Sequence, residues 1–126
     1  MKIEHIAMNV REPAALAQWY AANLGLRIIR ADTSGTFIHF LADDDGETLL
    51  EFYANDSGEY PQLGHWSFHI AFNSDDLAAS RDQLVAAGGT SVSDIITLGN
   101  GDQTTFVRDP WGIHVQLIRR IKPLEV

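Results

Sequence analysis

One pentapeptide occurs twice in this chain, and this near-repeat limits the possible folds more than any other feature. Residues 5–9, with the sequence HIAMN, return 64 positions later as residues 69–73, with the sequence HIAFN. Four of the five residues are identical, and the fifth exchanges one large apolar side chain for another. Self-similarity at a fixed spacing is the mark of an architecture built from repeated units. The chain is therefore expected to contain two copies of one module.

The residues that follow each copy predict a helix. Pro13 suits the first turn of a helix and Gly25 suits the position just past its end, with apolar residues at helical spacing between them. After the second copy, Ser74 is a candidate N-cap, and the pair Gly88 and Gly89 closes the helical segment. Each copy thus predicts a strand followed by a helix.

Three strand-like runs follow each predicted helix, so each module is expected to have βαβββ order. The runs are 26–31, 36–42 and 48–54 in the first half, and 91–98, 103–108 and 113–119 in the second. Residues 43–46 and 109–112 are the matching turns before the last strands. The predicted fold class is α+β, with two βαβββ modules related by pseudo-twofold symmetry in a single domain, 1–126. Module one spans 1–55, a polar linker spans 56–64 and module two spans 65–120.

The composition excludes several classes of protein. Across 126 residues, 17 acidic and 9 basic side chains give a formal net charge of −8. This balance argues against binding to nucleic acid, which needs clustered Lys and Arg, and against docking on an anionic membrane. The lack of cysteine excludes disulfides, thiolate zinc sites and cysteine nucleophiles. No apolar run resembles a targeting signal or a membrane span, so a cytoplasmic protein is expected.

Four polar residues on the predicted strands are candidates for a shared site. Residues i and i+2 of a strand point to the same side, and pseudo-symmetry would place His5 and His69 at equivalent positions. The last strand of each module carries Glu51 and Gln116, which are 65 positions apart. The equivalence of the second pair is imperfect, because Glu51 follows the turn glycine Gly46 by five residues and Gln116 follows its own by four.

Two imidazoles, one carboxylate and one amide oxygen are a plausible ligand set for one divalent metal ion. Mixed nitrogen and oxygen ligands with few carboxylates suit Zn, Ni, Co, Fe or Mn better than calcium. An inward carboxylate such as Glu51, flanked by apolar residues, is costly unless it is paired. Two alternatives remain open at this point. Each histidine could be a hydrogen-bonded structural residue, and Glu51 and Gln116 could face solvent across a sheet.

The sequence resembles the vicinal oxygen chelate superfamily, which includes glyoxalase I, extradiol dioxygenases and bleomycin resistance proteins. The resemblance covers nearly the whole chain and rests on residues 5–10 (HIAMNV), 19–26 (WYAANLGL), 69–72 (HIAF) and 109–117 (DPWGIHVQL). In the metal-dependent members of this superfamily, ligands come from the first and last strand of each module. The resemblance therefore implicates His5, Glu51, His69 and Gln116 as metal ligands. Gln116 stands where the family usually has Glu, and an amide cannot accept a proton at neutral pH.

The resemblance implies three functions. The first is a metal-dependent, glyoxalase I-like lyase or isomerase, which acts on a small substrate that chelates the metal through adjacent oxygens. Its base would be Glu51, with His114 and Tyr53 as further acid or base candidates. The second is an extradiol-type dioxygenase that holds Fe(II) with His5, His69 and Glu51. The third is a non-catalytic, bleomycin resistance-like binder of a cationic small molecule.

Aromatic residues would carry the binding in the third function. The three tryptophans, Trp19, Trp66 and Trp111, would suit a flat cation. His39 and His65 have no assigned partner and are interpreted as surface or core residues. A small-molecule substrate and a homodimer are expected, since relatives commonly pair modules between chains.

Overall fold

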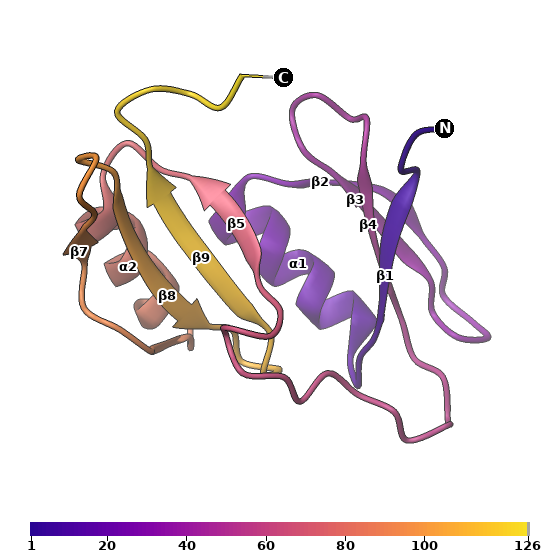
Figure 1. The fold of residues 1–126 in the computed structure, drawn as a ribbon. Coiled ribbons are helices and arrows are strands. Elements are labelled where there is room, and N and C mark those ends of the chain that lie inside the picture. Colours follow the sequence, from indigo (N-terminus) through magenta and orange to yellow (C-terminus); the bar gives the residue numbers. More distant parts are fainter. Residues whose placement is uncertain (126) are drawn as a thin grey trace. The chain divides into compact units, whose positions relative to one another are not determined.

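The computed structural model describes residues 1–125, which fold into two compact units (Figure 1). The first unit is Met1–Pro61, and the second begins at Gln62. Each unit packs one principal helix against one mixed sheet. The predicted α+β class with two βαβββ-like modules is confirmed.

The first unit has the βαβββ order that the sequence predicts. Its elements are β1 (His5–Asn9), α1 (Pro13–Leu24), β2 (Arg27–Ala31), β3 (His39–Ala42) and β4 (Leu49–Tyr53). The sheet order is β1-β4-β3-β2, in which β1 runs parallel to β4 and the other pairs are antiparallel. The first and last strands of the module are therefore paired directly by backbone hydrogen bonds.

Helix α1 defines which face of the first sheet is the core. Pro13 stands in its first turn, and Gly25 ends it with a left-handed φ of 72°, as predicted. Leu16 and Tyr20 on the helix are fully buried, and the Tyr20 ring lies 5.3 Å from the ring of Phe52 on β4. Because neighbouring strand residues point to opposite sides, Glu51 lies on the face away from α1.

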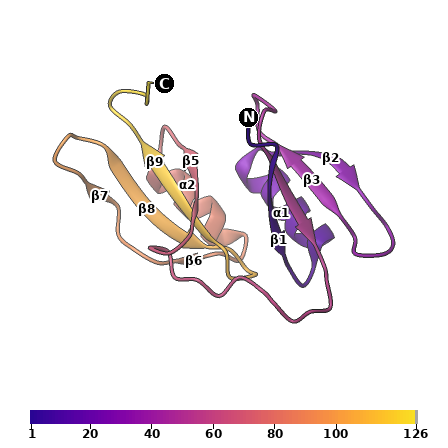
Figure 2. The same ribbon diagram turned by 45° about the vertical axis from the view of Figure 1, so that its right-hand side comes forward.

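The second unit repeats this arrangement, but two short strands take the place of a single edge strand in its sheet. Its elements are β5 (Ile70–Asn73), α2 (Leu77–Ala86), β6 (Thr90–Ser91), β7 (Ile96–Thr97), β8 (Gln103–Arg108) and β9 (His114–Arg119). Strand β5 runs parallel to β9, β9 is antiparallel to β8, and β6 and β7 both pair with β8 on its other side (Figure 2).

The strand expected over residues 91–98 is interrupted, and Ser93 explains the break. The backbone N–H of Phe106 donates to the Ser93 hydroxyl at 3.0 Å, and the Thr105 hydroxyl donates to the Ser93 carbonyl at 2.9 Å. Side chains thus replace regular ladder bonds on this stretch of β8, and two short strands result. The cap of α2 also differs from the expectation. Asp76 rather than Ser74 is the N-cap, and its carboxylate accepts from the Ala79 N–H at 3.0 Å.

Both predicted turns before the last strands are held by an aspartate side chain. The Asp43 carboxylate accepts from the Gly46 N–H at 2.9 Å. The buried Asp109 carboxylate accepts from the N–H groups of Trp111 at 2.8 Å and Ile113 at 2.9 Å. These local bonds fix where β4 and β9 begin, and hence where Glu51 and Gln116 stand. Over residues 1–125, no helix is long and apolar enough to cross a membrane.

Candidate functional site

The strand registers place Glu51 and Gln116 at equivalent positions. In the first unit Ala7 of β1 pairs with Glu51 of β4, and in the second unit Ala71 of β5 pairs with Gln116 of β9. His5 stands two residues before Ala7 and His69 stands two residues before Ala71. Glu51 and Gln116 are equivalent although they lie five and four residues after their turn glycines. The extra residue of the first unit lies between Gly46 and the start of β4. Each unit presents the same pattern of one histidine and one oxygen-bearing side chain.

In the first unit, His5 lies between two carboxylates. Its Nε2 atom is 3.3 Å from a carboxylate oxygen of Glu51, and its Nδ1 atom is 2.9 Å from a carboxylate oxygen of Glu4. The Glu51 side chain is only 15% exposed, whereas that of Glu4 is 73% exposed. A neutral imidazole carries one N–H and can donate to only one of the two. If Nδ1 donates to Glu4, the Nε2 lone pair and the Glu51 carboxylate are two acceptors side by side, which is an arrangement that a cation between them would stabilise.

In the second unit, one hydrogen bond engages a nitrogen of His69 and another engages the amide nitrogen of Gln116. The second polar atom of each side chain is not used in that bond. The Nδ1–H of His69 donates to the carbonyl of His65 at 2.8 Å, which leaves the Nε2 lone pair unused by that bond. The Gln116 amide nitrogen donates to the hydroxyl of buried Thr104 at 2.8 Å, so its amide oxygen is the atom left to act as a ligand. The two bonds orient a nitrogen donor and an oxygen donor.

A phenylalanine accompanies the histidine and the oxygen donor in each unit, and sequence reasoning missed both. Phe40 pairs with Glu51 across β3 and β4, and Phe106 pairs with Gln116 across β8 and β9. The His5 and Phe40 ring centroids are 5.6 Å apart and those of His69 and Phe106 are 5.1 Å apart, both edge to face. Each phenylalanine stands in the next-to-last strand of its module, but only the pairing with the last strand places it beside the candidate ligand.

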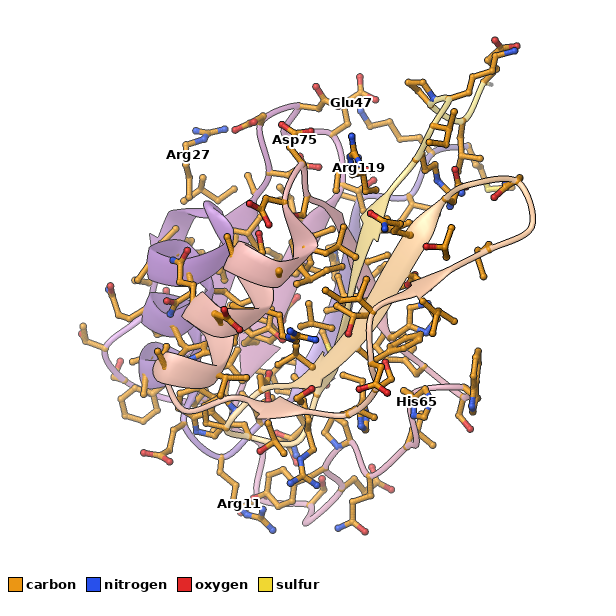
Figure 3. All side chains as sticks on the ribbon, turned by 90° about the vertical axis from the view of Figure 1, so that its left-hand side faces the viewer. Arg11, Arg27, Glu47, His65, Asp75 and Arg119 are labelled. Atoms are coloured by element: carbon orange, nitrogen blue, oxygen red, sulfur yellow. The ribbon has the colours of Figure 1, made fainter. Side chains whose placement is uncertain are left out.

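The second unit also contains a cluster of aromatic rings around Phe106. This aromatic cluster consists of His65, Trp66, Phe106 and His114. The His65 ring lies 4.8 Å from Trp66, 4.7 Å from Phe106 and 5.7 Å from His114. Figure 3 shows His65 on the side of the sheet away from α2. The sequence predicts a surface or core residue without a partner at His65, whereas the structure places it among these rings.

Burial lowers the pKa of His114 within this cluster. A backbone hydrogen bond with Leu63 acts in the opposite direction, and the neighbouring His65 lowers the pKa further. The lowered pKa favours the neutral form of the His114 imidazole.

The other residues singled out from the sequence differ in their surroundings. Tyr53 is half-buried at the end of β4, two residues beyond Glu51 and thus on the same face. His39 is buried on the helix side of the first sheet, where its Nδ1–H donates to the Phe37 carbonyl. Trp19 is 8% exposed in the core around α1, which removes it from the residues expected to stack on a ligand. Trp66 is 81% exposed.

The part of the chain that the structure describes contains no group of three or more His, Asp and Glu side chains at metal-ligand spacing. The first unit brings His5 and Glu51 together. In the second unit His69 lies just before β5 and contacts Phe106, which pairs with Gln116. Each unit therefore supplies two of the four candidate ligands.

Comparison with known proteins decides the family. The sequence model described as Glyoxalase/Bleomycin resistance protein/Dioxygenase superfamily matches residues 2–117. The chain belongs to this superfamily. It is 26% identical over 125 residues to a probable lactoylglutathione lyase of Vibrio parahaemolyticus serotype O3:K6, and the match covers 94% of this chain and 90% of that protein.

Solved structures share the fold. A glyoxalase/bleomycin resistance protein/dioxygenase family enzyme from Burkholderia phytofirmans PsJN matches with a TM-score of 0.79 at 15% identity, over 94% of this chain and 98% of that one. A glyoxalase I mutant from Zea mays matches with a TM-score of 0.74 at 20% identity, over 96% of this chain and 46% of that one. At these identities the likeness concerns the fold alone.

Proposed function

We propose that this chain is a metal-dependent lyase or isomerase of the glyoxalase I type, acting on a small substrate through two adjacent oxygens. The observation that carries the proposal is the position of His5 between the carboxylates of Glu4 and Glu51. A divalent cation between His5 Nε2 and Glu51 would satisfy both of these acceptor atoms. The 26% identity to a probable lactoylglutathione lyase supports this choice within the superfamily.

The four candidate ligands fit such a cation chemically. His5 and His69 offer imidazole nitrogens, Glu51 offers a carboxylate and Gln116 an amide oxygen, a mixed set that suits Zn, Ni, Co, Fe or Mn. Three of the four are oriented by a second hydrogen bond, as ligands of metal sites usually are. The acceptors in these bonds are the Glu4 carboxylate for His5, the His65 carbonyl for His69 and the Thr104 hydroxyl for Gln116.

Glu51 would be the base that moves a proton between neighbouring carbons of the substrate. It is the carboxylate among the four candidate ligands, and the amide of Gln116 cannot accept a proton at neutral pH. A metal ion held by these residues would supply Lewis acidity to the two substrate oxygens. Tyr53, on the same strand face as Glu51, and His114, two residues before Gln116, are further acid or base candidates.

Metal content tests this function. The protein would be purified without chelators or a histidine tag, and the bound metal measured for the wild type, Glu51→Ala and His69→Ala. We expect about one transition metal ion per chain in the wild type and loss of the ion in both variants. Retention of the metal in both variants would place it elsewhere and contradict the proposed ligands.

The identity of the metal separates the alternatives. Zinc or nickel favours the isomerase, whereas iron with oxygen consumption on catechol-like substrates favours the dioxygenase. No bound metal, even after reconstitution with zinc, nickel or iron(II), would contradict both enzymes. The exposed Trp66 and the net charge of −8 would then favour the binder of a cationic small molecule.

A further inference from the structure

Trp66 is a large apolar side chain that is 81% exposed beside the candidate ligands of the second unit. It is not isolated, because its ring centroid lies 5.7 Å from that of Phe106 and 4.8 Å from that of His65. One ring edge is thus supported by the protein while most of the indole remains open to solvent. Exposed aromatic surface held in this way is a common feature of ligand-binding sites.

Phe106 joins this open indole to the candidate ligands. It contacts Trp66 on one side and His69, at 5.1 Å between ring centroids, on another. It also pairs directly with Gln116 across β8 and β9, and directly paired residues project from the same face of a sheet. The rings of Trp66, Phe106 and His69 therefore form a continuous series, all within one unit, that leads to the two donor atoms.

The chemistry of this series suits an uncharged ligand group. Trp66 and Phe106 carry no charge, and most of the Trp66 indole surface is open to a ligand. A flat apolar group laid on Trp66 would bury aromatic surface on both sides without stripping water from a charged partner. An alkyl group of one or two carbons has no flat face and too little apolar surface to gain a comparable contact.

We propose that Trp66 and Phe106 bind a flat, uncharged aromatic substituent of the substrate, so that the protein favours aryl over small alkyl substrates. This inference rests on the proposed function, since the donor atoms of His69 and Gln116 set where the substrate begins. It names the substrate class that the second unit selects, and it makes Trp66 a residue that determines specificity.

Two hydroxamates test the inference, because both chelate metals through adjacent oxygens and they differ only in a phenyl or a methyl group. Dissociation constants of benzohydroxamate and acetohydroxamate would be measured by calorimetry on zinc-loaded protein. We expect the wild type to bind the phenyl compound about tenfold more tightly, the size of one good aromatic contact. Trp66→Ala should abolish this ratio and Trp66→Phe should keep part of it. Ile96→Ala, which removes another exposed apolar side chain of the same unit, should leave it unchanged.

A second readout keeps this test separate from the proposed function. In metal-free protein, the indole N–H signal that disappears in Trp66→Ala should shift on addition of benzohydroxamate and not of acetohydroxamate. A shift in a protein that binds no zinc would support the binding of an aryl group by Trp66 and Phe106. The same result would contradict the proposed metal-dependent lyase or isomerase. An unchanged ratio in Trp66→Ala with intact zinc binding would overturn the inference and leave the proposed function standing. Conversion of a dimer to a monomer in Trp66→Ala, with that unchanged ratio, would assign Trp66 to an interface instead.

Discussion

The two units share a frame but differ in how they hold their polar side chains. Each has a histidine two residues before an alanine of its first strand, a phenylalanine in its next-to-last strand and an oxygen donor in its last strand. In the first unit the partners are charged, since Glu4 and Glu51 both approach His5. In the second unit the partners are neutral, a backbone carbonyl for His69 and a hydroxyl for Gln116.

This difference indicates a division of roles between the repeats. The first unit concentrates negative charge, which under the proposed function would attract the cation and supply the base. The second unit orients neutral donors and places Phe106 of the aromatic cluster beside them, which would suit recognition of an apolar group. A duplicated frame fixes where the side chains stand, and the residues at those positions then decide the chemistry of each half.

Removal of the charge difference should have the largest effect. Glu51→Gln would give both units an amide and remove the carboxylate from the proposed ligand set. We expect affinity for zinc to fall by more than about 100-fold, beyond the effect of losing an outer hydrogen bond, and the proposed isomerase activity to be lost. Competition with a chromophoric chelator measures the affinity. The reverse change, Gln116→Glu, should keep or strengthen metal binding, and equal losses in both variants would contradict the division of roles.

The repeated asparagine offers a matched test of stability. Buried Asn9 donates to the carbonyls of Asn55 and Glu59 and accepts from the Asn55 N–H at 2.6 Å, whereas its repeat counterpart Asn73 is exposed. Asn9→Ala should lower the free energy of unfolding by about 1–2 kcal/mol, because three part-buried hydrogen bonds to the backbone of Asn55 and Glu59 are lost. Asn73→Ala should change it by less than about 0.5 kcal/mol. Urea unfolding of both variants checks the difference, and equal effects would refute the asymmetry.

The orientation of Gln116 should have a smaller effect on metal binding. Thr104→Val keeps the shape of the side chain but removes the hydroxyl that accepts from the Gln116 amide. With that amide free to rotate, affinity for zinc should fall by about tenfold, the lower end for a lost outer hydrogen bond. Thr104→Ser retains a hydroxyl and should recover most of the affinity. If both variants bind zinc as weakly as each other, the hydroxyl does not act through Gln116.

Much of the frame could be predicted from the sequence, because the signals involved are local. Pro13 and Gly25 bound α1 as expected, and the Asp109 turn follows from side-chain bonds within five residues. The repeat itself predicted two modules with the same order of elements. These features depend on short stretches of chain, so a single sequence carries them.

The rest depends on contacts between strands, which the sequence leaves open until a register is known. Phe106 reads as an ordinary core residue until the pairing of β8 with β9 places it beside Gln116. Ser93 reads as part of one strand until its bonds to Thr105 and Phe106 divide it. The surroundings of His65 are likewise set by rings from β8 and β9. Such partners are distant in sequence, and no local pattern specifies them.

The smallest effect we expect concerns pH and a position at which the units differ. His114 stands two residues before Gln116, where the first unit has Leu49 before Glu51. Burial lowers the pKa of His114 below its usual 6.5, so near that pH the unfolded chain binds more protons than the folded one. Stability should therefore fall as the pH drops below about 6.5, and His114→Leu should fall less steeply because it has no proton to bind. Urea unfolding between pH 8 and pH 5 measures both slopes. Identical slopes would show that other titratable groups cause the loss of stability at low pH and that His114 does not contribute to it.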